Sequence, residues 1–131
     1  MHNARKISSM TSSSKRKGSV AEVAVVKWLS SRGIRAGRIR AGWTDDRGDV
    51  NALDGVVIEV KNRKTHDWKA YFEQLGRQME ASDAWSGVIL CKRPGYTNPD
   101  DWLAVMPAAV WLTTIQLITE TQEESERWPS S

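Results

Sequence analysis

Asp49, Glu59 and Lys61 are the residues in this chain whose types and spacing could do chemistry together. Glu59 and Lys61 are two residues apart in a strand-like run, so their side chains share one face of that strand. Asp54-Gly55, the strongest hairpin signal in the sequence, lies between Asp49 and Glu59. A hairpin here would bring the two carboxylates to a similar height, although its exact register is left open.

Two neighbouring carboxylates resist joint ionisation unless a cation lies between them. Oxygen ligands without His or Cys favour Mg²⁺, with Mn²⁺ as a substitute. Such an ion polarises a phosphate oxygen and lowers the pKa of a bound water, while Lys61 can orient that water or stabilise charge at phosphorus. The trio therefore suits phosphodiester hydrolysis. The alternative is a cross-strand salt bridge between Lys61 and either acid, but the basic residues that follow, Arg63 and Lys64, favour a phosphate site.

The elements that must position these residues follow from hydrophobic periodicity and from turn signals. We predict a helix over 19–32, strands over 34–41, 49–53 and 56–61, a helix over 67–84, strands over 86–92 and 102–106, and a last helix over 107–118. Gly33 would end the first helix, Asp67 would cap the second and Pro107 would open the third.

The second predicted helix carries an apolar stripe of Trp68, Phe72, Leu75 and Met79. It connects two strands, and a helical crossover implies that those strands pair in parallel. We therefore expect an α/β fold in the order α-β-β-β-α-β-β, with a central mixed sheet flanked by helices.

The chain of 131 residues suits one domain, and its charge is distributed unevenly. Residues 1–40 hold ten Lys or Arg and one acid, whereas residues 41–131 hold nine Lys or Arg and fifteen acids. This asymmetry favours a basic surface for a polyanion. We expect a disordered basic, Ser-rich segment over 1–14, a catalytic domain over 15–119 and a loose acidic tail over 120–131.

The sequence shows neither a secretory signal nor an apolar run of the roughly 18 residues that span a bilayer. Its single cysteine, Cys91, cannot form an internal disulfide and is expected to be a buried core residue. We therefore predict an intracellular protein, in the cytoplasm or, if phage-encoded, in the host cytoplasm, with no membrane and no small-molecule cofactor.

Asp49, nine residues, then Glu59-Val60-Lys61 resembles the signature of the PD-(D/E)xK nuclease superfamily. The segment from Lys17 to Glu22 is similar to the Lys-Gly-x-x-x-Glu that opens archaeal- and phage-type Holliday junction resolvases. The resemblance covers about residues 15–106 and implies a restriction-endonuclease-like core. Two positions depart from the pattern: Gly48 replaces the expected proline, and Val23 replaces an arginine that often follows the helical Glu.

The resemblance implies a role for each matching residue. Asp49, Glu59 and the backbone carbonyl of Val60 would bind Mg²⁺, Lys61 would assist the attacking water, and Glu22 would approach the same metal from the first helix. Apolar neighbours at helical spacing support a partner for Glu22 independently, although a salt bridge to Lys or Arg would also satisfy it.

Further residues are candidates for DNA contact or for minor roles in the site. The expected phosphate contacts are Lys15, Arg16, Lys17, Arg38, Arg40, Arg63 and Lys64. Gln74 or Gln78 could reach the site from the second helix, Asp45 and Asp46 are alternative metal ligands, and Trp43 could stack on an unpaired base, although plain surface, turn and packing roles are favoured for these five.

The function favoured by the sequence is that of a Mg²⁺-dependent, structure-selective DNA endonuclease, most simply a Holliday junction resolvase. A four-way junction has two-fold symmetry, so this reading predicts a homodimer. Two alternatives stay open: another nuclease of the superfamily, such as a nicking, flap or restriction-like enzyme, and a DNA-binding module without cleavage. Clustered acids would repel phosphate, which argues against the second alternative.

Overall fold

The computed structural model describes residues 2–39 and 48–128, and it describes side chains from Arg16 onward within these ranges. The elements are α1 (His2–Ser31), β1 (Gly37–Arg38), β2 (Val50–Asn51), β3 (Val56–Lys61), α2 (Trp68–Ala81), β4 (Ser86–Cys91), a 3₁₀ turn η1 (Pro99–Asp101), β5 (Leu103–Val105) and α3 (Ala108–Arg127). This α-β-β-β-α-β-β-α order confirms the α/β fold expected from the sequence.

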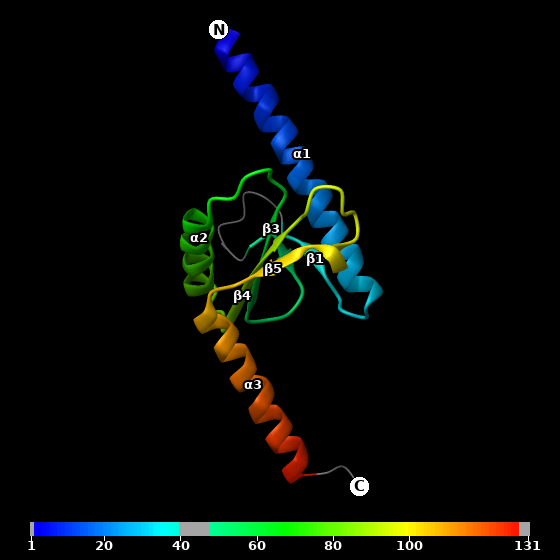
Figure 1. Cartoon of the computed structure of the whole chain (residues 1–131), viewed down its shortest axis with the longest axis vertical. Helices are drawn as coiled ribbons and strands as arrows, with labels where there is room; N and C mark the ends of the chain where they lie inside the picture. Colours follow the sequence, from blue (N-terminus) through cyan, green and yellow to red (C-terminus); the bar gives the residue numbers. More distant parts are fainter. Residues whose placement is uncertain (1, 40–47, 129–131) are drawn as a thin grey trace.

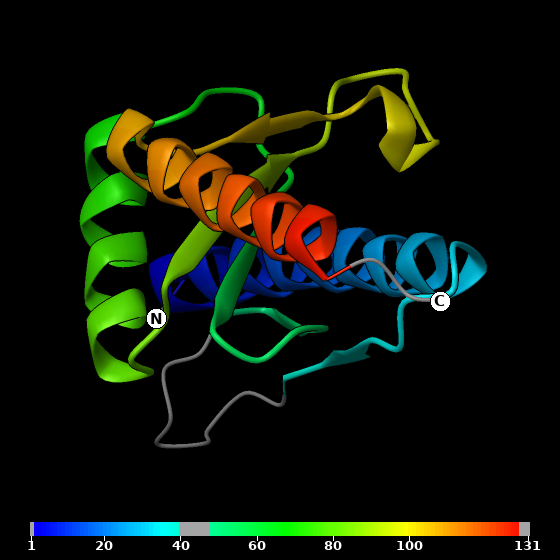
Figure 2. The same ribbon diagram turned by 90° about the horizontal axis from the view of Figure 1, so that it is seen from below.

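The five strands form one mixed sheet in the order β1-β2-β3-β4-β5. β3 and β4 pair in parallel through the α2 crossover, as predicted, while the other neighbouring strands pair antiparallel. α1 and α2 flank the sheet, and α3 runs away from it (Figures 1 and 2). The β3–β4 pair therefore forms the centre of the sheet.

Side chains of β3 alternate between two hydrophobic cores, one on each face of the sheet. Ile58 and Val60 pack with Ala21 and Val25 of α1, whereas Val57 packs with residues of α2 and with Ile89 and Cys91 of β4. Cys91 is buried and free, as expected. Glu59 and Lys61 follow Val57 at intervals of two residues, so their side chains point to the same α2 face of β3.

The turn and cap signals of the sequence have the predicted local geometry. Gly55 has φ +81°, and its carbonyl accepts hydrogen bonds from the backbone N–H groups of Trp85 and Ser86 at 2.9 and 3.1 Å. Asp67 caps α2 by accepting a hydrogen bond from the backbone of Ala70 at 3.1 Å. These contacts fix the hairpin and the start of the crossover on either side of β3.

Both terminal helices are longer than predicted. α1 begins at His2, so its backbone is helical through the segment expected to be disordered; no proline precedes Pro94 to interrupt it. α3 continues to Arg127 instead of ending near Ile118. Glu and Gln favour its last turns, and Arg127 lies four residues after Glu123, a spacing that stabilises helices.

The first two strands are shorter than predicted. β1 lies at the edge of the sheet, where it pairs with β2 and is exposed along its length. The ladder nevertheless extends toward the candidate site, since the N–H of Ile39 donates to the carbonyl of Asp49 at 3.0 Å. Hydrophobic alternation marks where a strand is possible, whereas pairing decides how far it runs.

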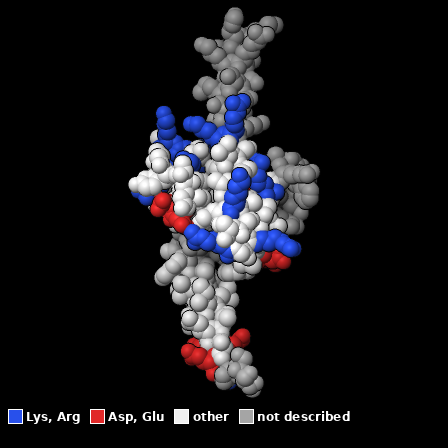
Figure 3. All heavy atoms as spheres, turned by 90° about the vertical axis from the view of Figure 1, so that its right-hand side faces the viewer, with Lys and Arg blue, Asp and Glu red and all other residues white. Residues whose placement is uncertain are grey.

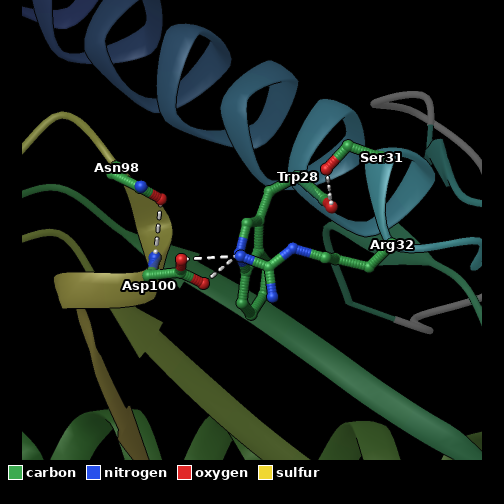
Figure 4. Close-up of polar contacts among 5 residues, drawn as sticks. All are labelled: Trp28, Ser31, Arg32, Asn98 and Asp100. Carbon is green, nitrogen blue, oxygen red and sulfur yellow. Dashed lines mark hydrogen bonds and ion pairs between the residues drawn. The ribbon is translucent and has the colours of Figure 1, made fainter.

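Asp100 of η1 ties the carboxyl end of α1 to the far edge of the sheet (Figure 4). It accepts a hydrogen bond from the Trp28 indole at 2.8 Å and one from the Arg32 guanidinium at 2.6 Å. The indole donor and the guanidinium together hold the pKa of the Asp100 carboxyl below its ordinary value. Asn98 caps the same turn by accepting from the backbone of Asp100.

In the part of the chain that the structure describes, no helix is both long enough and apolar enough to cross a membrane.

The hairpin requires glycine at position 55. We expect Gly55→Ala to destabilise the fold by about 1–3 kcal/mol, because the residue has positive φ and a Cβ would clash with the Trp85 ring. As a matched control, Gly76→Ala lies on the exposed side of α2 with open space around it and should stabilise by about 1 kcal/mol. Urea unfolding would measure both variants. An unchanged midpoint for Gly55→Ala would contradict this account of the turn.

Candidate active site

Asp49 is held at the start of the hairpin by backbone contacts on two sides. Its N–H donates to the carbonyl of Ile58 at 2.9 Å, and its Oδ2 accepts from the N–H of Val60 at 2.8 Å. The register that pairs Val50 with Ile58 also sets Asp49 beside Glu59. In an extended strand, the N–H and C=O of one residue point the same way, so the Val60 carbonyl points toward Asp49 as well.

Gly48 explains one departure from the nuclease signature. Its φ is +97°, which proline cannot adopt, and a Cβ there would lie 2.8 Å from the Ile58 carbonyl oxygen. The close approach of Gly48 to β3 is what allows Asp49 to reach Ile58 and Val60. At this position glycine does what the fold requires, and the expected proline would not fit.

Glu59 is the most deeply buried acid of the described residues, with 1% of its surface exposed. Its Oε1 has no hydrogen-bond partner among those residues, and its Oε2 lies 3.5 Å from the Lys61 ammonium. Burial and the charge of Asp49 raise the pKa of Glu59 to about 7, although Lys61 and a hydrogen bond with Gln78 act in the opposite direction. A buried, protonatable carboxyl beside a second carboxylate is a place where a cation would be stabilised.

Lys61 is oriented by residues of α2. Its ammonium donates to Gln74 Oε1 at 3.0 Å and lies 4.9 Å from the centre of the Tyr71 ring, a cation–π distance. The Tyr71 hydroxyl is in turn 3.1 Å from His66 Nδ1. These contacts hold the ammonium beside Glu59 with little freedom to swing into solvent.

Glu22 reaches the same place from α1. Its carboxylate forms a 2.9 Å ion pair with Arg38, which also donates to the Ser19 hydroxyl at 3.1 Å. Burial and the neighbouring charge of Asp49 raise the pKa of Glu22, while Arg38 lowers it. The salt bridge expected as the alternative for Glu22 is present, and Glu22 lies close enough to Asp49 to feel its charge, while its approach to a metal stays a prediction.

These groups surround a cavity of about 430 Å³ between α1 and the end of β3. Its lining residues are Lys17, Gly18, Glu22, Asp49, Val60, Lys61, Asn62, Arg63 and Lys64. The Asn62 amide donates to the Lys17 carbonyl at 3.5 Å and so joins the two walls. Glu59 lies behind this lining, next to Asp49. The cavity thus combines two carboxylates with four cationic side chains.

The structure brings together most of the residues singled out in the sequence, but not all of them. Lys17, Arg63 and Lys64 line the cavity, Arg16 is exposed on α1, and Arg38 is engaged with Glu22. Residues 40–47 lie outside the described residues, and with them Arg40, Trp43, Asp45 and Asp46, as does the Lys15 side chain.

The donor set fits a hard divalent cation, although it is sparse. Among the described side chains, no cluster of three or more His, Cys, Asp or Glu is arranged to hold a metal ion. Asp49 and Glu59 nevertheless offer carboxylate oxygens side by side, one of them without a hydrogen-bond partner, and the Val60 carbonyl points to the same side. Oxygen-only ligands of this kind suit Mg²⁺, which commonly keeps several waters.

Tyr71 and Asn62 were not predicted as site residues, and the buried face of α2 is confirmed only in part. Leu75 is buried and Phe72 and Met79 pack against the same core, as predicted. Tyr71 and Gln78 are also buried, whereas Trp68 is 37% exposed. The polar face of α2 turns toward β3 because Glu59 and Lys61 need partners there. Tyr71, Gln74 and Gln78 recur at i, i+3 and i+7, and that spacing is the signal that could have identified this face.

Comparison with known proteins returned no matching family model, no curated relative and no similar solved structure.

The raised pKa of Glu59 predicts how stability depends on pH when metal is absent. A folded-state pKa of about 7 against an ordinary value of 4.5 favours the protonated form in the native state. The contribution of protonated Glu59 to the stability of the fold is therefore complete below pH 4.5, and it is lost as pH rises through 7. We expect the free energy of unfolding of the metal-free wild type to be on the order of 3 kcal/mol lower than that of Glu59→Gln at pH 8. Near pH 4 the two proteins should be equally stable.

Urea unfolding in a chelator at several pH values would measure this difference, with Glu73→Gln on the exposed side of α2 as the matched control. Adding Mg²⁺ at pH 8 should stabilise wild type more than Glu59→Gln, because a bound cation compensates the buried charge. Stability curves for wild type and Glu59→Gln that run parallel from pH 4 to 8 would contradict the assigned environment of Glu59.

Proposed function

We propose that this protein is a Mg²⁺-dependent DNA endonuclease that hydrolyses phosphodiester bonds in the cavity beside Asp49. The observation that carries the proposal is the composition of that cavity. Acidic Glu22 and Asp49 line it together with cationic Lys17, Lys61 and Arg63. Acids alone would repel a phosphate, and cations alone would bind it without chemistry, whereas the combination serves both binding and hydrolysis.

Each side chain has a task that its position supports. Lys17, Arg63 and Lys64 face the cavity from two walls and would hold the phosphates on either side of the scissile bond. Lys61, fixed by Gln74 and Tyr71, would orient the attacking water and stabilise negative charge as it develops. Arg38 is positioned to neutralise Glu22, or to contact phosphate when Glu22 takes another partner.

Asp49, Glu59 and the Val60 carbonyl would hold the metal ion, with Glu22 close by. The ion supplies polarisation of the phosphate and a more acidic bound water. With the ion bound, Glu59 would be ionised, because the added positive charge outweighs the repulsion from Asp49. The cavity accommodates a phosphate group and several waters at about 430 Å³.

The resemblance to PD-(D/E)xK nucleases of the Holliday junction resolvase type supports the choice of substrate. The α-β-β-β-α-β order agrees with it, as does the hairpin that sets Asp49 beside Glu59. We therefore propose a four-way junction as the first substrate to test. Other branched or nicked DNA remains the second candidate, because the cavity itself recognises a phosphate and not a branch.

Cleavage should depend on the two carboxylates and the ammonium that the hairpin brings together. We expect Asp49→Asn, Glu59→Gln and Lys61→Ala each to reduce Mg²⁺-dependent cleavage by at least about 100-fold while the variants still fold and bind DNA. Labelled four-way junction, flap, nicked duplex and single-stranded substrates would be incubated with each variant, and the products compared.

Matched controls are available on the exposed face of α2. Glu73→Gln and Lys69→Ala remove the same kinds of charge away from the cavity and should cleave like wild type. Near-wild-type cleavage by Asp49→Asn or Glu59→Gln would rule out this site. Equal cutting of flaps and junctions would favour the general nuclease over the resolvase, and binding of all substrates without cutting would favour the DNA-binding module.

Binding should weaken with salt in proportion to the phosphates that the cavity neutralises. Neutralising Lys17, Arg63 and Lys64 together with Gln should lower the slope of log affinity against log salt by up to about 3. The control triple variant Lys69, Arg77 and Arg127 to Gln removes the same charge elsewhere and should change the slope far less. Fluorescence anisotropy with duplex DNA would measure both slopes, and equal slopes would exclude the cavity as the contact.

A further inference from the structure

α3 presents an apolar face that the rest of the described chain leaves uncovered. Trp111, Ile115 and Ile118 recur at i, i+4 and i+7 and form one stripe, with Leu112 beside it. These four side chains are 39–53% exposed. Apolar residues at this spacing normally face a core, so the stripe lacks the surface it would pack against.

The stripe continues into a groove between α3 and the loop before β4. Its apolar lining consists of Trp85, Leu117 and Ile118. Thr114 and Thr121 also line the groove. The groove has a volume of about 630 Å³. α3 is held there by contacts that include the pair of hydroxyls of Thr114 and Ser86, 3.1 Å apart. The helix therefore has one side anchored, with the stripe turned away from it.

The apolar part of α3 carries no charged residue, whereas the carboxyl-terminal turns of the helix are acidic. No Asp, Glu, Lys or Arg occurs from residue 102 to residue 119, whereas Glu120, Glu123, Glu124 and Glu126 follow in the last turns of α3. Figure 3 shows this arrangement as a largely white protrusion with red at its tip. A nucleic acid or an acidic membrane surface would be repelled by the tip and would gain nothing from the apolar stripe.

We infer that α3 is the interface of a homodimer in which it packs antiparallel against α3 of a second copy. α3 carries five exposed large apolar side chains, and Trp85 and Trp128 are exposed as well. A standard interface takes roughly 800 Å² from each partner, so it needs an extended apolar surface of this kind. Like surfaces meet in a two-fold dimer, and an uncharged stripe allows this without repulsion.

The acidic ends select the antiparallel orientation. Parallel helices would set eight glutamates side by side at one end, whereas antiparallel packing places the four of each helix at opposite ends. It also brings each acidic carboxyl end toward the positive amino end of the other helix. With Ile115 near the two-fold axis, Trp111 of the partner subunit lies level with Ile118 and can enter the groove beside Trp85.

This interface leaves the candidate active site free. The cavity lies where α1 leaves the body, and α3 leaves at the opposite end (Figure 1). The proposed interface therefore leaves the cavity of each copy uncovered. The inference rests on the α3 surface alone and does not depend on the nuclease function proposed above.

Sedimentation velocity at micromolar concentration tests the dimer. Wild type should sediment as a dimer of twice 14.7 kDa, and Leu112→Glu should shift it to monomer. Leu53→Glu is the matched control, since Leu53 is also an exposed leucine, 58% against 50%, but lies in the β2–β3 hairpin. Circular dichroism confirms that both variants fold. A monomeric wild type, or monomers from both variants, would overturn the inference.

Disulfide trapping tests the orientation without disturbing the apolar surface broadly. Ile115→Cys lies near the axis and should form a disulfide-linked dimer under mild oxidation. Glu126→Cys lies eleven residues farther along α3, so the two copies of it would be roughly 30 Å apart and should not link. Linkage at both positions would show a parallel pair, and linkage at neither would show another interface; either result overturns the antiparallel dimer.

Discussion

The arrangement of the site depends on the burial of Glu59 beside Asp49. Removing a carboxylate from water costs several kcal/mol unless charge or hydrogen bonds compensate, and a second carboxylate adds to the cost. The protein alone compensates only in part, through the Lys61 ammonium and Gln78, and the pKa of Glu59 remains raised to about 7. This is the balance expected of a site that a cation completes, because full compensation by the protein would leave nothing for a metal to stabilise.

The burial of Glu59 constrains the surrounding elements in turn. α2 must present Gln74 and Gln78 to β3 instead of a purely apolar face, and the parallel β3–β4 crossover is what lays α2 over that side of the strand. The hairpin must bring Asp49 within reach of the Val60 N–H, which requires the positive φ of Gly48. A polar cluster at the centre of a sheet thus sets the register of one strand pair and the rotation of one helix.

The sequence predicted the parts of the site that follow from local chain geometry. Alternation along β3 placed Glu59 and Lys61 on one face, and Asp54-Gly55 placed Asp49 across from them; both are properties of a few neighbouring residues. The apolar stripe of α2 was predicted correctly at Phe72, Leu75 and Met79, which pack into the core, but Trp68 is exposed. Tyr71 and Gln78 are buried as well, because this side of the helix also faces the polar residues of β3. The Arg38–Glu22 pair and the cavity wall at Asn62 depend on tertiary packing, and no local pattern carries them.

The ends of the molecule show how the uneven charge of the sequence is used. The cavity with its four cationic side chains lies where α1 leaves the body, while α3 carries its four glutamates to the other end (Figures 1 and 3). A helix of 20 residues spans about 30 Å, several Debye lengths at physiological salt. Under the proposed function, acids at that distance would not repel a polyanion bound at the cavity, whereas the same acids on the body would. The uncharged stretch of α3 therefore separates the two charges physically while it offers an apolar surface of its own.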